Sequence, residues 1–422
     1  MKTSNLKKVI ASQRLSFSKT PFGVEREQLE SIKELIKVPH ALVITGLRRA
    51  GKSTFLVQIA QKYYAQEDFF YTHFEDERLL DFSVDDFEKL LVHQIEMFGD
   101  HRCFFLDEIQ NVKGWEVFVR RLLDNGYKVF ITGSNASLLS RELGTRLTGR
   151  YVPIELYPFS FNEYLRLNLK SEKLTHFPAV LSSSEEAILL RSFDAYMQEG
   201  GIPEALLYPA ANAHQGIYQD VLYRDIITRH NVEQVKALKE LSAYLLSNVA
   251  RPFAYSKLRQ LVSLGSLNTV KNFIDYLENS WLFFTINLYA FSVKKQQIAP
   301  KKIYSIDTGM VRSLGFYSSE DSGRLFENIV FLELHKKYGE LFYYKSKTGH
   351  EVDFLSRKNH LLFQACIDFE DKEVRQRELR GLIESAKELG WKQGQILTLN
   401  QEEEFEQDDI RITVLPLQSW IL

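Results

Sequence analysis

The feature that most constrains this chain is the octapeptide GLRRAGKS at residues 46–53. It matches the pattern GxxxxGK[ST], follows the apolar run ALVIT and precedes the amphipathic segment TFLVQIAQKYY. Glycines let the backbone curl, so that its N–H groups and the start of the following helix surround phosphate oxygens. The strand–loop–helix context predicts a phosphate-binding loop and disfavours the alternative, a chance Gly-Lys-Ser turn at a helix start.

Each position of this loop has an expected role. Lys52 is expected to reach the β- and γ-phosphates of a bound nucleotide, and Ser53 to bind Mg²⁺. The other positions expected to contact nucleotide are Gly46, Leu47, Arg48, Arg49, Ala50, Gly51 and Thr54. Two interpretations of the Arg48 and Arg49 side chains stay open: they steer phosphate, or they lie in solvent.

A second motif is the run CFFLDE at residues 103–108, which ends in two carboxylates. A strand buried on both faces that ends in acids delivers them to the carboxyl edge of a parallel sheet, where ligands bind. Asp107 is therefore predicted to hold Mg²⁺, mostly through water, and Glu108 to polarise the attacking water. Taken alone, such a run is also typical of a strand that simply meets solvent.

The run KVFITGSN ends a further predicted strand with small polar residues. Ser134 is the first candidate to orient water or the γ-phosphate and Asn135 the second, the alternative being that both cap the next helix. Arg141, Arg146 and Arg150 follow. An arginine finger, supplied within the chain or across a subunit boundary, suits this region, and Arg150 is favoured over Arg146. A structural role for either arginine stays open.

Pattern changes along the chain indicate several domains. Between about residues 32 and 158 short apolar runs alternate with helical stretches, which predicts a parallel sheet sandwiched by helices. Two short helices around Gly265, followed by a hairpin, predict a winged helix-turn-helix. The predicted parts are an N-terminal segment (1–25), an α/β core (26–158), a helical lid (159–235), a winged helix (236–315) and a small mixed α/β domain (316–422).

Composition narrows the class of protein. A length of 422 residues with 45% hydrophobic residues and a formal charge of -2 excludes a single small module and global disorder. Two cysteines, Cys103 and Cys366, are too few for a disulfide framework or a four-ligand zinc site. The first residues have no apolar core of signal-peptide length, and the most apolar later run, 281–291, is shorter than the ~18 residues of a membrane span. These features predict a cytoplasmic protein with no membrane partner.

Charge is unevenly distributed. Residues 236–302 carry ten Lys or Arg against three acids, a net charge of +7. The second helix of the predicted winged helix would enter a major groove and the wing would touch phosphate. The residues concerned are Asn268, Thr269, Lys271 and Asn272 on the helix and Lys294 and Lys295 on the wing. The alternative is a module that packs against other domains or binds a protein partner, with the lysines in solvent.

The order of five segments resembles the AAA-type ATPases of archaeal and bacterial genomes, whose C-terminal half is a domain of uncharacterised function. The segments are TGLRRAGKST, FFLDEIQNV, ITGSNASLLS, LTGRYVPIELYPFSFNEYL and MQEGGIPEAL. The resemblance implies an additional-strand P-loop NTPase core with a helical lid, related to the signal-transduction ATPases with numerous domains. In that group a Gly-x-Pro turn lies near the nucleotide, which maps onto Gly201 and Pro203; an ordinary interhelical turn is the alternative. Ser53 stands where many relatives have threonine, and either hydroxyl can ligate Mg²⁺.

The last hundred residues resemble the PD-(D/E)xK nuclease fold, through Glu327 on a helix, Asp353 at the end of GHEVDF and Gln364 on LLFQACI. In that fold, carboxylates and a lysine hold Mg²⁺ and activate water. Here Cys366 occupies the lysine position and Gln364 replaces a carboxylate, which weakens a Mg²⁺ site and removes a stabilising cation. The resemblance implies a non-cutting domain in which Glu327, Asp353 and Gln364 are structural or weak metal residues. The acidic stretch QEEEFEQDD is predicted to be a solvated loop.

Together the motifs predict an ATPase with ATP and Mg²⁺ as cofactors, in which hydrolysis moves the lid and the appended modules. Three outputs stay open: a nucleic-acid-associated motor or switch, a protein-interaction signalling ATPase that never touches DNA, and an ATP-regulated nuclease. An oligomer is compatible with all three.

Overall fold

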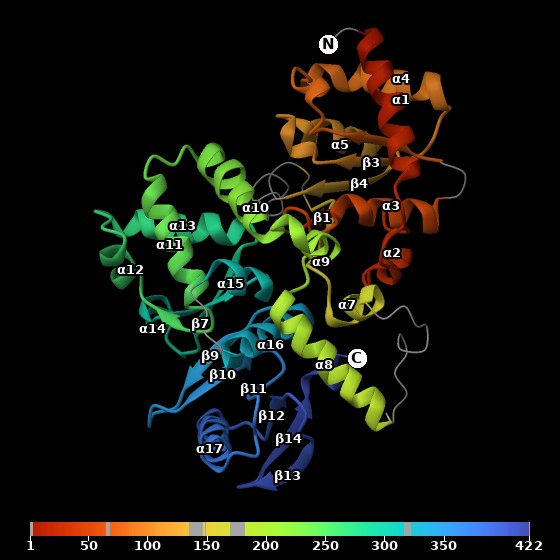
Figure 1. The fold of residues 1–422 in the computed structure, drawn as a ribbon. Coiled ribbons are helices and arrows are strands. Elements are labelled where there is room, and N and C mark those ends of the chain that lie inside the picture. The colour runs from red at the N-terminus through yellow and green to blue at the C-terminus, as the bar shows by residue number, and fades with distance from the viewer. Residues whose placement is uncertain are drawn as a thin grey trace. The chain divides into compact units, whose positions relative to one another are not determined.

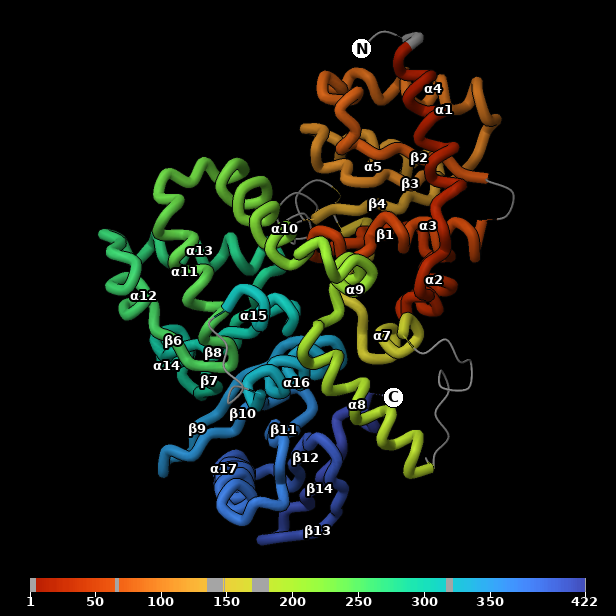
Figure 2. Tube along the Cα trace, in the orientation of Figure 1, coloured from red at the N-terminus to blue at the C-terminus, as the bar shows by residue number. Residues whose placement is uncertain are grey.

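The structure is a computed structural model that describes residues 3–64, 68–134, 147, 149–168, 182–315 and 322–421. The chain divides into two compact units (Figures 1 and 2). The first comprises Met1–Pro158 with Asn279–Trp281, and the second Phe159–Glu278 with Leu282–Leu422. Among the described residues no helix combines the length and the apolar character needed to cross a membrane.

The first unit is built on a five-stranded parallel sheet in the order β2-β3-β4-β1-β5. The strands are β1 (Ala41–Thr45), β2 (Phe70–His73), β3 (Cys103–Asp107), β4 (Lys128–Gly133) and β5 (Tyr151–Glu155). The predicted parallel sheet is confirmed, and β4 lies between β1 and β3, as the additional-strand core requires. The register aligns His73 with Asp107 and Ile44 with Thr132, so the carboxyl ends of four strands meet at one edge.

Helices cover both faces of this sheet because successive side chains of each strand point in opposite directions. Phe104 and Leu106 of β3 face one core, whereas Cys103 and Phe105 face the other. Helices α4 (Phe87–Phe98) and α5 (Trp115–Asp124) pack into the first core, and α2 (Leu29–Leu35) and α3 (Lys52–Tyr63) into the second. Helix α1 (Thr3–Lys19), in the segment left without a structural assignment, packs along β2 and contributes side chains to both cores.

The second unit begins with helices and continues as a mixed α/β structure. Ser182 and Glu185 form a capping box that starts the second helix, since each side chain pairs with the other's backbone N–H. The helices are α7 (Phe161–Asn168), α8 (Ser183–Glu199), α9 (Pro203–Leu207), α10 (Ala213–Asp220), a π-helical stretch (Val221–Thr228), α11 (Val235–Ser247), α12 (Tyr255–Leu261), α13 (Leu267–Asn279), α14 (Val293–Ile298), α15 (Thr308–Leu314), α16 (Ser322–Tyr338), α17 (Lys372–Leu389) and α18 (Leu417–Ile421).

A nine-stranded sheet runs through the second unit in the order β13-β14-β12-β11-β10-β9-β7-β8-β6. Its strands are β6 (Pro252–Phe253), β7 (Phe283–Leu288), β8 (Lys301–Ser305), β9 (Phe342–Lys345), β10 (Glu351–Ser356), β11 (Leu361–Ala365), β12 (Gln393–Thr398), β13 (Glu403–Gln407) and β14 (Ile410–Pro416). Strands β7 and β9 pair in parallel, Asn287 opposite Phe342. The predicted winged-helix hairpin and the C-terminal strands therefore share one sheet.

Two local predictions in this unit are wrong. The acidic stretch is not a loop, because β13 lies within it and pairs antiparallel with β14, whose Ile412 and Val414 are buried. Its acidic side chains are nevertheless solvated, as expected of an edge strand. Lys294 and Lys295 lie on helix α14, where Ser292 accepts a hydrogen bond from the Lys295 N–H, rather than on an extended wing.

Candidate functional site

The phosphate-binding loop connects the end of β1 to the start of α3. A Cβ atom on Gly46 would lie 2.1 Å from the carbonyl oxygen of Leu156, so only glycine fits against β5 at this point. Gly51 precedes α3 with a φ of 93°, in the left-handed region that favours glycine. The first N–H groups of a twelve-residue helix thus point into the loop, as phosphate binding requires.

Lys52 and Glu108 converge at this loop. The Lys52 ammonium is buried and donates to the carbonyls of Gly46 and Leu47, at 3.3 and 3.1 Å. It also lies 3.7 Å from Glu108 Oε1. Two residues 56 positions apart in sequence, selected by different motifs, are therefore neighbours in space.

Asp107, at the end of β3, is fully buried; two hydroxyls donate to it, and an imidazole nitrogen lies within ion-pair distance without meeting hydrogen-bond geometry. Tyr71 donates its hydroxyl to Asp107 Oδ2 at 3.1 Å, His73 Nδ1 lies 3.3 Å from the same oxygen, and the Thr132 hydroxyl donates to Oδ1. Burial raises the pKa of Asp107, but His73, Thr132 and Ser53 outweigh it, so the pKa lies below its ordinary value. An ionised carboxylate beside a serine hydroxyl is an oxygen donor set that fits Mg²⁺.

Glu108 takes its orientation from the backbone. It has a φ of 53°, in the left-handed region, directly after the last residue of β3. Its N–H donates to Thr132 Oγ1 at 2.9 Å, and Gln110 donates to its carboxylate. A strained residue held by neighbours is typical of functional sites.

Two buried hydroxyls at the same edge have no hydrogen-bond partner among the described residues: Ser134 Oγ and Thr45 Oγ1. Ser134 is only 2% exposed and directly follows β4. An unsatisfied buried polar group needs a partner such as a ligand or an ordered water. Asn135, Arg141 and Arg146, also considered in the sequence analysis, lie outside the described residues.

The three described arginines proposed for phosphate chemistry differ, and Arg49 is the exposed one. Arg48 is mostly buried and forms an ion pair with Glu75 at 3.1 Å, so the interpretation that it lies free in solvent is wrong. The Arg150 carbonyl accepts from the N–H of Ala41 at the start of β1, and its side chain pairs with Asp124. The loop follows the other end of β1, roughly 15 Å away at ~3.3 Å per residue. Arg150 is therefore far from the phosphate loop of its own chain, and it could act as an arginine finger only at the site of a second copy of the chain.

Sequence reasoning missed several residues of this site, above all His73. Burial lowers its pKa, but the carboxylates of Asp107, Glu108 and Glu75 outweigh this and raise it above the ordinary value. The rule that pointed to Asp107, a polar residue at the carboxyl end of a buried strand, also applies to His73 in the run FFYTHFE. Arg26 was missed as well; it is buried and donates to the carbonyl of Ala50 at 2.9 Å.

Comparison with known proteins agrees with this geometry. The family described as an AAA domain matches residues 38–165, which include the loop and both carboxylates. An uncharacterised protein of Methanocaldococcus jannaschii, MJ1544, is 34% identical over 410 residues, covering 92% of this chain and 90% of its own length. The chain belongs to the AAA-type P-loop ATPases. An uncharacterised protein of Haemophilus influenzae is 31% identical over 342 residues, covering 78% of the ATPase and 82% of that relative.

The rest of the ATPase matches two domains of unknown function, DUF8612 at residues 190–321 and DUF4143 at residues 322–420. Among solved structures, the Orc1 protein of Aeropyrum pernix in complex with DNA matches at 13% identity and a TM-score of 0.36, over 71% of the ATPase and 94% of that chain. The STAND protein PH0952 of Pyrococcus horikoshii matches at 16% identity and a TM-score of 0.29, over 76% of the ATPase and 47% of the PH0952 chain. Similarities this weak carry no functional conclusion.

The predicted lid turn of the ATPase is held from within the second unit. The Gly201 N–H donates to Asp307 Oδ2 at 2.7 Å, and a Cβ on Gly201 would lie 2.2 Å from the Phe159 carbonyl oxygen. A Cβ on Gly200, whose φ is 76°, would lie 2.4 Å from the Asp307 carboxylate. Close packing thus accounts for both glycines and supports the interhelical-turn interpretation. A nucleotide contact by Gly201 and Pro203 stays a prediction.

Glu327 and Asp353, the carboxylates of the predicted nuclease-like site, lie beside Lys302, a residue of the predicted winged helix. Lys302 Nζ lies 3.0 Å from Glu327 Oε1, 2.7 Å from Glu351 Oε1 and 3.0 Å from Asp353 Oδ1. Lys302 is 2% exposed, so its inclusion in an exposed basic face was wrong. The reason is tertiary: pairing of β7 with β9 brings β8 into the same sheet as β10. The domain that lacks the motif lysine therefore has a lysine from another strand.

This cluster of Glu327, Glu351, Asp353 and Lys302 is closed by further contacts. Gln364 accepts from the Asp353 N–H at 2.8 Å and donates to the Glu351 carbonyl at 3.1 Å, so both ends of its amide are used. Burial, with a contribution from Asp353, raises the pKa of Glu327 to about 8 although Lys302 opposes it. Among the described residues no group of three or more His, Cys, Asp or Glu side chains is arranged to hold a metal ion.

Proposed function

We propose that the chain is a Mg²⁺-dependent ATPase that hydrolyses ATP to ADP and phosphate at the edge of the parallel sheet. The observation that carries the proposal is the convergence of Lys52, Asp107 and Glu108 at one loop. Ser53 and Asp107 would hold Mg²⁺, which when bound neutralises charge on the phosphates. The backbone N–H groups of residues 46–54 would bind the phosphate oxygens.

The chain's own residues then divide the chemistry. Glu108 orients the attacking water and accepts its proton, and Lys52 stabilises the negative charge that develops on the γ-phosphoryl oxygens. The Ser134 hydroxyl, which has no partner among the described residues, supplies a hydrogen bond to that water or to the γ-phosphate. Arg150 of a second copy would complete the site. Hydrolysis is proposed to move the appended second unit.

Paired substitutions test the assignment. Glu108→Gln keeps the size of the side chain but removes the base, so kcat should fall by about 10²–10⁴-fold while ATP still binds. Lys52→Ala should lose nucleotide affinity. Lys62→Ala, on the same helix but paired with Glu25 and Glu30, serves as the matched control and should behave as the parent. Equal ATPase rates in Glu108→Gln and the parent would remove Glu108 as base.

Duplex DNA is proposed as the partner, and a basic segment within the second unit favours it. Between Asn279 and Ile306 the chain has no acid and four lysines, of which Lys302 is buried and Lys294, Lys295 and Lys301 can reach a partner. On α13 the side chains of Asn268, Lys271 and Asn272 are exposed, and so are Lys294 and Lys295 on α14. The order α11-β6-α12-α13-β7-α14-β8 is the one expected of a winged helix in which a short helix, α14, joins the two wing strands.

Two further contacts support the proposal. Lys271 of α13 and Lys301 at the start of β8 both approach the ring of Tyr255, at 5.7 and 5.8 Å, so these two lysines are near each other. Exposed Phe291, beside the α14 lysines, equally suits a protein partner, which is the alternative.

The DNA affinity of the full chain should fall steeply with salt concentration. Removing the ammonium groups of Lys294 and Lys295 should reduce the slope of log affinity against log salt concentration by about one for each DNA phosphate that is no longer neutralised. Absent or salt-independent binding favours the protein partner.

An ATP-regulated nuclease is the least supported output. The carboxylates of Glu327 and Asp353 are already paired with the Lys302 ammonium, and both ends of the Gln364 amide are hydrogen-bonded to the backbone. The groups that would bind a metal are therefore already in use. The nuclease hypothesis predicts Mg²⁺-dependent strand cleavage that Asp353→Ala abolishes. No cleavage of single- or double-stranded DNA or RNA would retire it.

A further inference from the structure

The free side of β2, the edge strand of the parallel sheet, is covered by helix α1. An edge strand leaves main-chain N–H and C=O groups without strand partners. The side-chain amide of Gln13 fills this role for His73: Nε2 donates to the His73 carbonyl at 2.9 Å, and Oε1 accepts from the His73 N–H at 3.1 Å. The Gln13 amide thus substitutes for a neighbouring peptide group and holds the last residue of β2.

Helix α1 also contacts the other residue of β2 that reaches Asp107. The ring of Phe17 stacks on the ring of Tyr71, with centroids 4.1 Å apart and an interplanar angle of 28°. Tyr71 and His73 point to the same side of the strand, because they are two residues apart, and both approach Asp107 Oδ2. Two side chains of α1 therefore support the two residues that hold this carboxylate from the β2 side.

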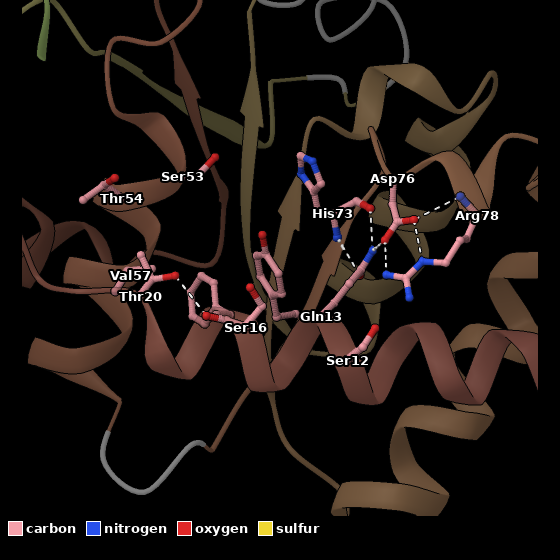
Figure 3. Close-up of a pocket in the computed structure, with 12 residues that line it drawn as sticks. Ser12, Gln13, Ser16, Thr20, Ser53, Thr54, Val57, His73, Asp76 and Arg78 are labelled. Carbon is pink, nitrogen blue, oxygen red and sulfur yellow. Dashed lines mark hydrogen bonds and ion pairs between the residues drawn. The ribbon is translucent and has the colours of Figure 1, made fainter. Parts of the chain in front are cut away.

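A cavity of about 360 Å³ lies between α1, the end of β2 and the first turn of α3 (Figure 3). The α1 side is lined by Ser12, Gln13, Ser16, Phe17 and Thr20, and the α3 side by Ser53, Thr54 and Val57. Figure 3 shows Gln13 between α1 and the β2 end, linked to His73 and to Asp76, whose carboxylate also binds Arg78. Gln13 is 6% exposed, so its hydrogen bonds are made away from bulk water.

We infer that Gln13 is a positioning residue of the ATPase site. It fixes the end of β2 so that the His73 ring and the Tyr71 hydroxyl set the Asp107 carboxylate in the orientation in which Asp107 and Ser53 bind Mg²⁺. The inference rests on the proposed function for the role of Asp107. It extends the site to a helix that precedes the matched AAA domain, residues 38–165.

Gln13→Met tests the inference, because methionine keeps the length of the side chain and removes its hydrogen bonds. The readout is equilibrium binding of a fluorescent ADP analogue at a series of Mg²⁺ concentrations, followed by ATPase rates. Half-maximal Mg²⁺ should rise about tenfold, the typical effect of losing a residue that orients a metal ligand. Binding of the analogue in EDTA should match the parent, and kcat at saturating Mg²⁺ should change less than threefold.

Arg14→Met is the matched control. Arg14 ties the same helix to the other end of β2, through the Phe69 carbonyl at 3.0 Å, and covers the ring of Phe98 at 4.1 Å. It should lower the thermal midpoint without moving the Mg²⁺ dependence. His73→Ala should also raise the half-maximal Mg²⁺ concentration, and the double variant should shift it by less than the sum of the two single shifts, because Gln13 acts partly through the His73 ring.

Two results would overturn the inference. One is a Gln13→Met protein that loses thermal stability like Arg14→Met but keeps the parent's Mg²⁺ dependence. The other is a His73→Ala protein with unchanged Mg²⁺ dependence, which decides the matter even where Gln13→Met fails to fold. Failure of the proposed function looks different, since the parent itself would then bind nucleotide without regard to Mg²⁺ or to Lys52→Ala.

Discussion

Buried Lys302 lies within 3.0 Å of three partly buried carboxylates, and its removal should be costly. In Lys302→Met the side chain keeps its length while Glu327, Glu351 and Asp353 lose the ammonium that lies 2.7–3.0 Å from each. Lys345, 3.2 Å from Glu351, still offsets part of that charge. Removing one partner from a buried ion pair costs roughly 3–5 kcal/mol, because an uncompensated charge stays behind. The expected loss of unfolding free energy is therefore about 3–5 kcal/mol.

The assay is thermal and urea unfolding of the full chain. For a unit of about 150–250 residues, 1 kcal/mol shifts the midpoint by roughly 2–4 °C, so a fall of about 6–20 °C is expected. Lys301→Met is the matched control, since Lys301 is the adjacent residue on β8 and lies 5.8 Å from the Tyr255 ring centroid. It should cost about 1 kcal/mol or less.

A second substitution separates charge from packing. Glu351→Gln in the Lys302→Met background removes a carboxylate whose pKa Lys302 holds below its ordinary value, and it should restore part of the loss. Equal costs for Lys302→Met and Lys301→Met would refute the reasoning. Full restoration of Lys302→Met by millimolar Mn²⁺, with no effect on the parent, would show that the ammonium occupies a position competent for a divalent cation.

Two further predictions concern the phosphate loop and the pH dependence of stability. Gly46→Ala places a Cβ 2.1 Å from the Leu156 carbonyl oxygen, so ATPase activity should be lost. The control Gly216→Ala, in open space on α10, should keep the activity and raise the free energy of unfolding by about 0.5–1 kcal/mol. Parent-like activity of Gly46→Ala would contradict the packing argument. Burial raises the pKa of Glu327 from 4.5 to about 8, so the folded state holds this proton more tightly and unfolding free energy should fall as pH rises from about 4.5 to 8. Urea titrations at pH 5.5 and 8.5 should show a smaller decrease in unfolding free energy for Glu327→Gln than for the parent. An equal decrease in both proteins would contradict this role of Glu327.

The parallel sheet and its ligand edge were predictable because they follow from local signals. Apolar runs of strand length, each ending in a glycine or a polar residue and separated by helical periodicity, specify both the strands and the edge at which their carboxyl ends meet. These signals pointed to five candidate site residues, which follow or end three strands that are neighbours in the sheet: Lys52, Ser53, Asp107, Glu108 and Ser134. The His73 signal was present in the same form and was overlooked.

Contacts between distant segments were not predictable. Gln13 and His73 are 60 residues apart, and Lys302 and Asp353 are 51 apart, with no spacing rule that links either pair. Whether a residue is buried or exposed also depended on such contacts. Lys301 and Lys302 are equivalent in sequence, but only Lys302 is buried. Alternation along a strand decides this, and it can be read only once the register of the neighbouring strand is known.

The sequence by itself thus determined the phosphate loop, the carboxylates that face it and the parallel order of the core, because each depends on residues within one strand–loop–helix segment. Only the tertiary structure decided which element covers the edge strand, which cation enters the carboxylate cluster and whether the hairpin of the predicted winged helix is separate from the C-terminal strands. Those outcomes arise from hydrogen bonding and burial between elements far apart in the chain. Their free energy depends on the whole fold rather than on any local pattern.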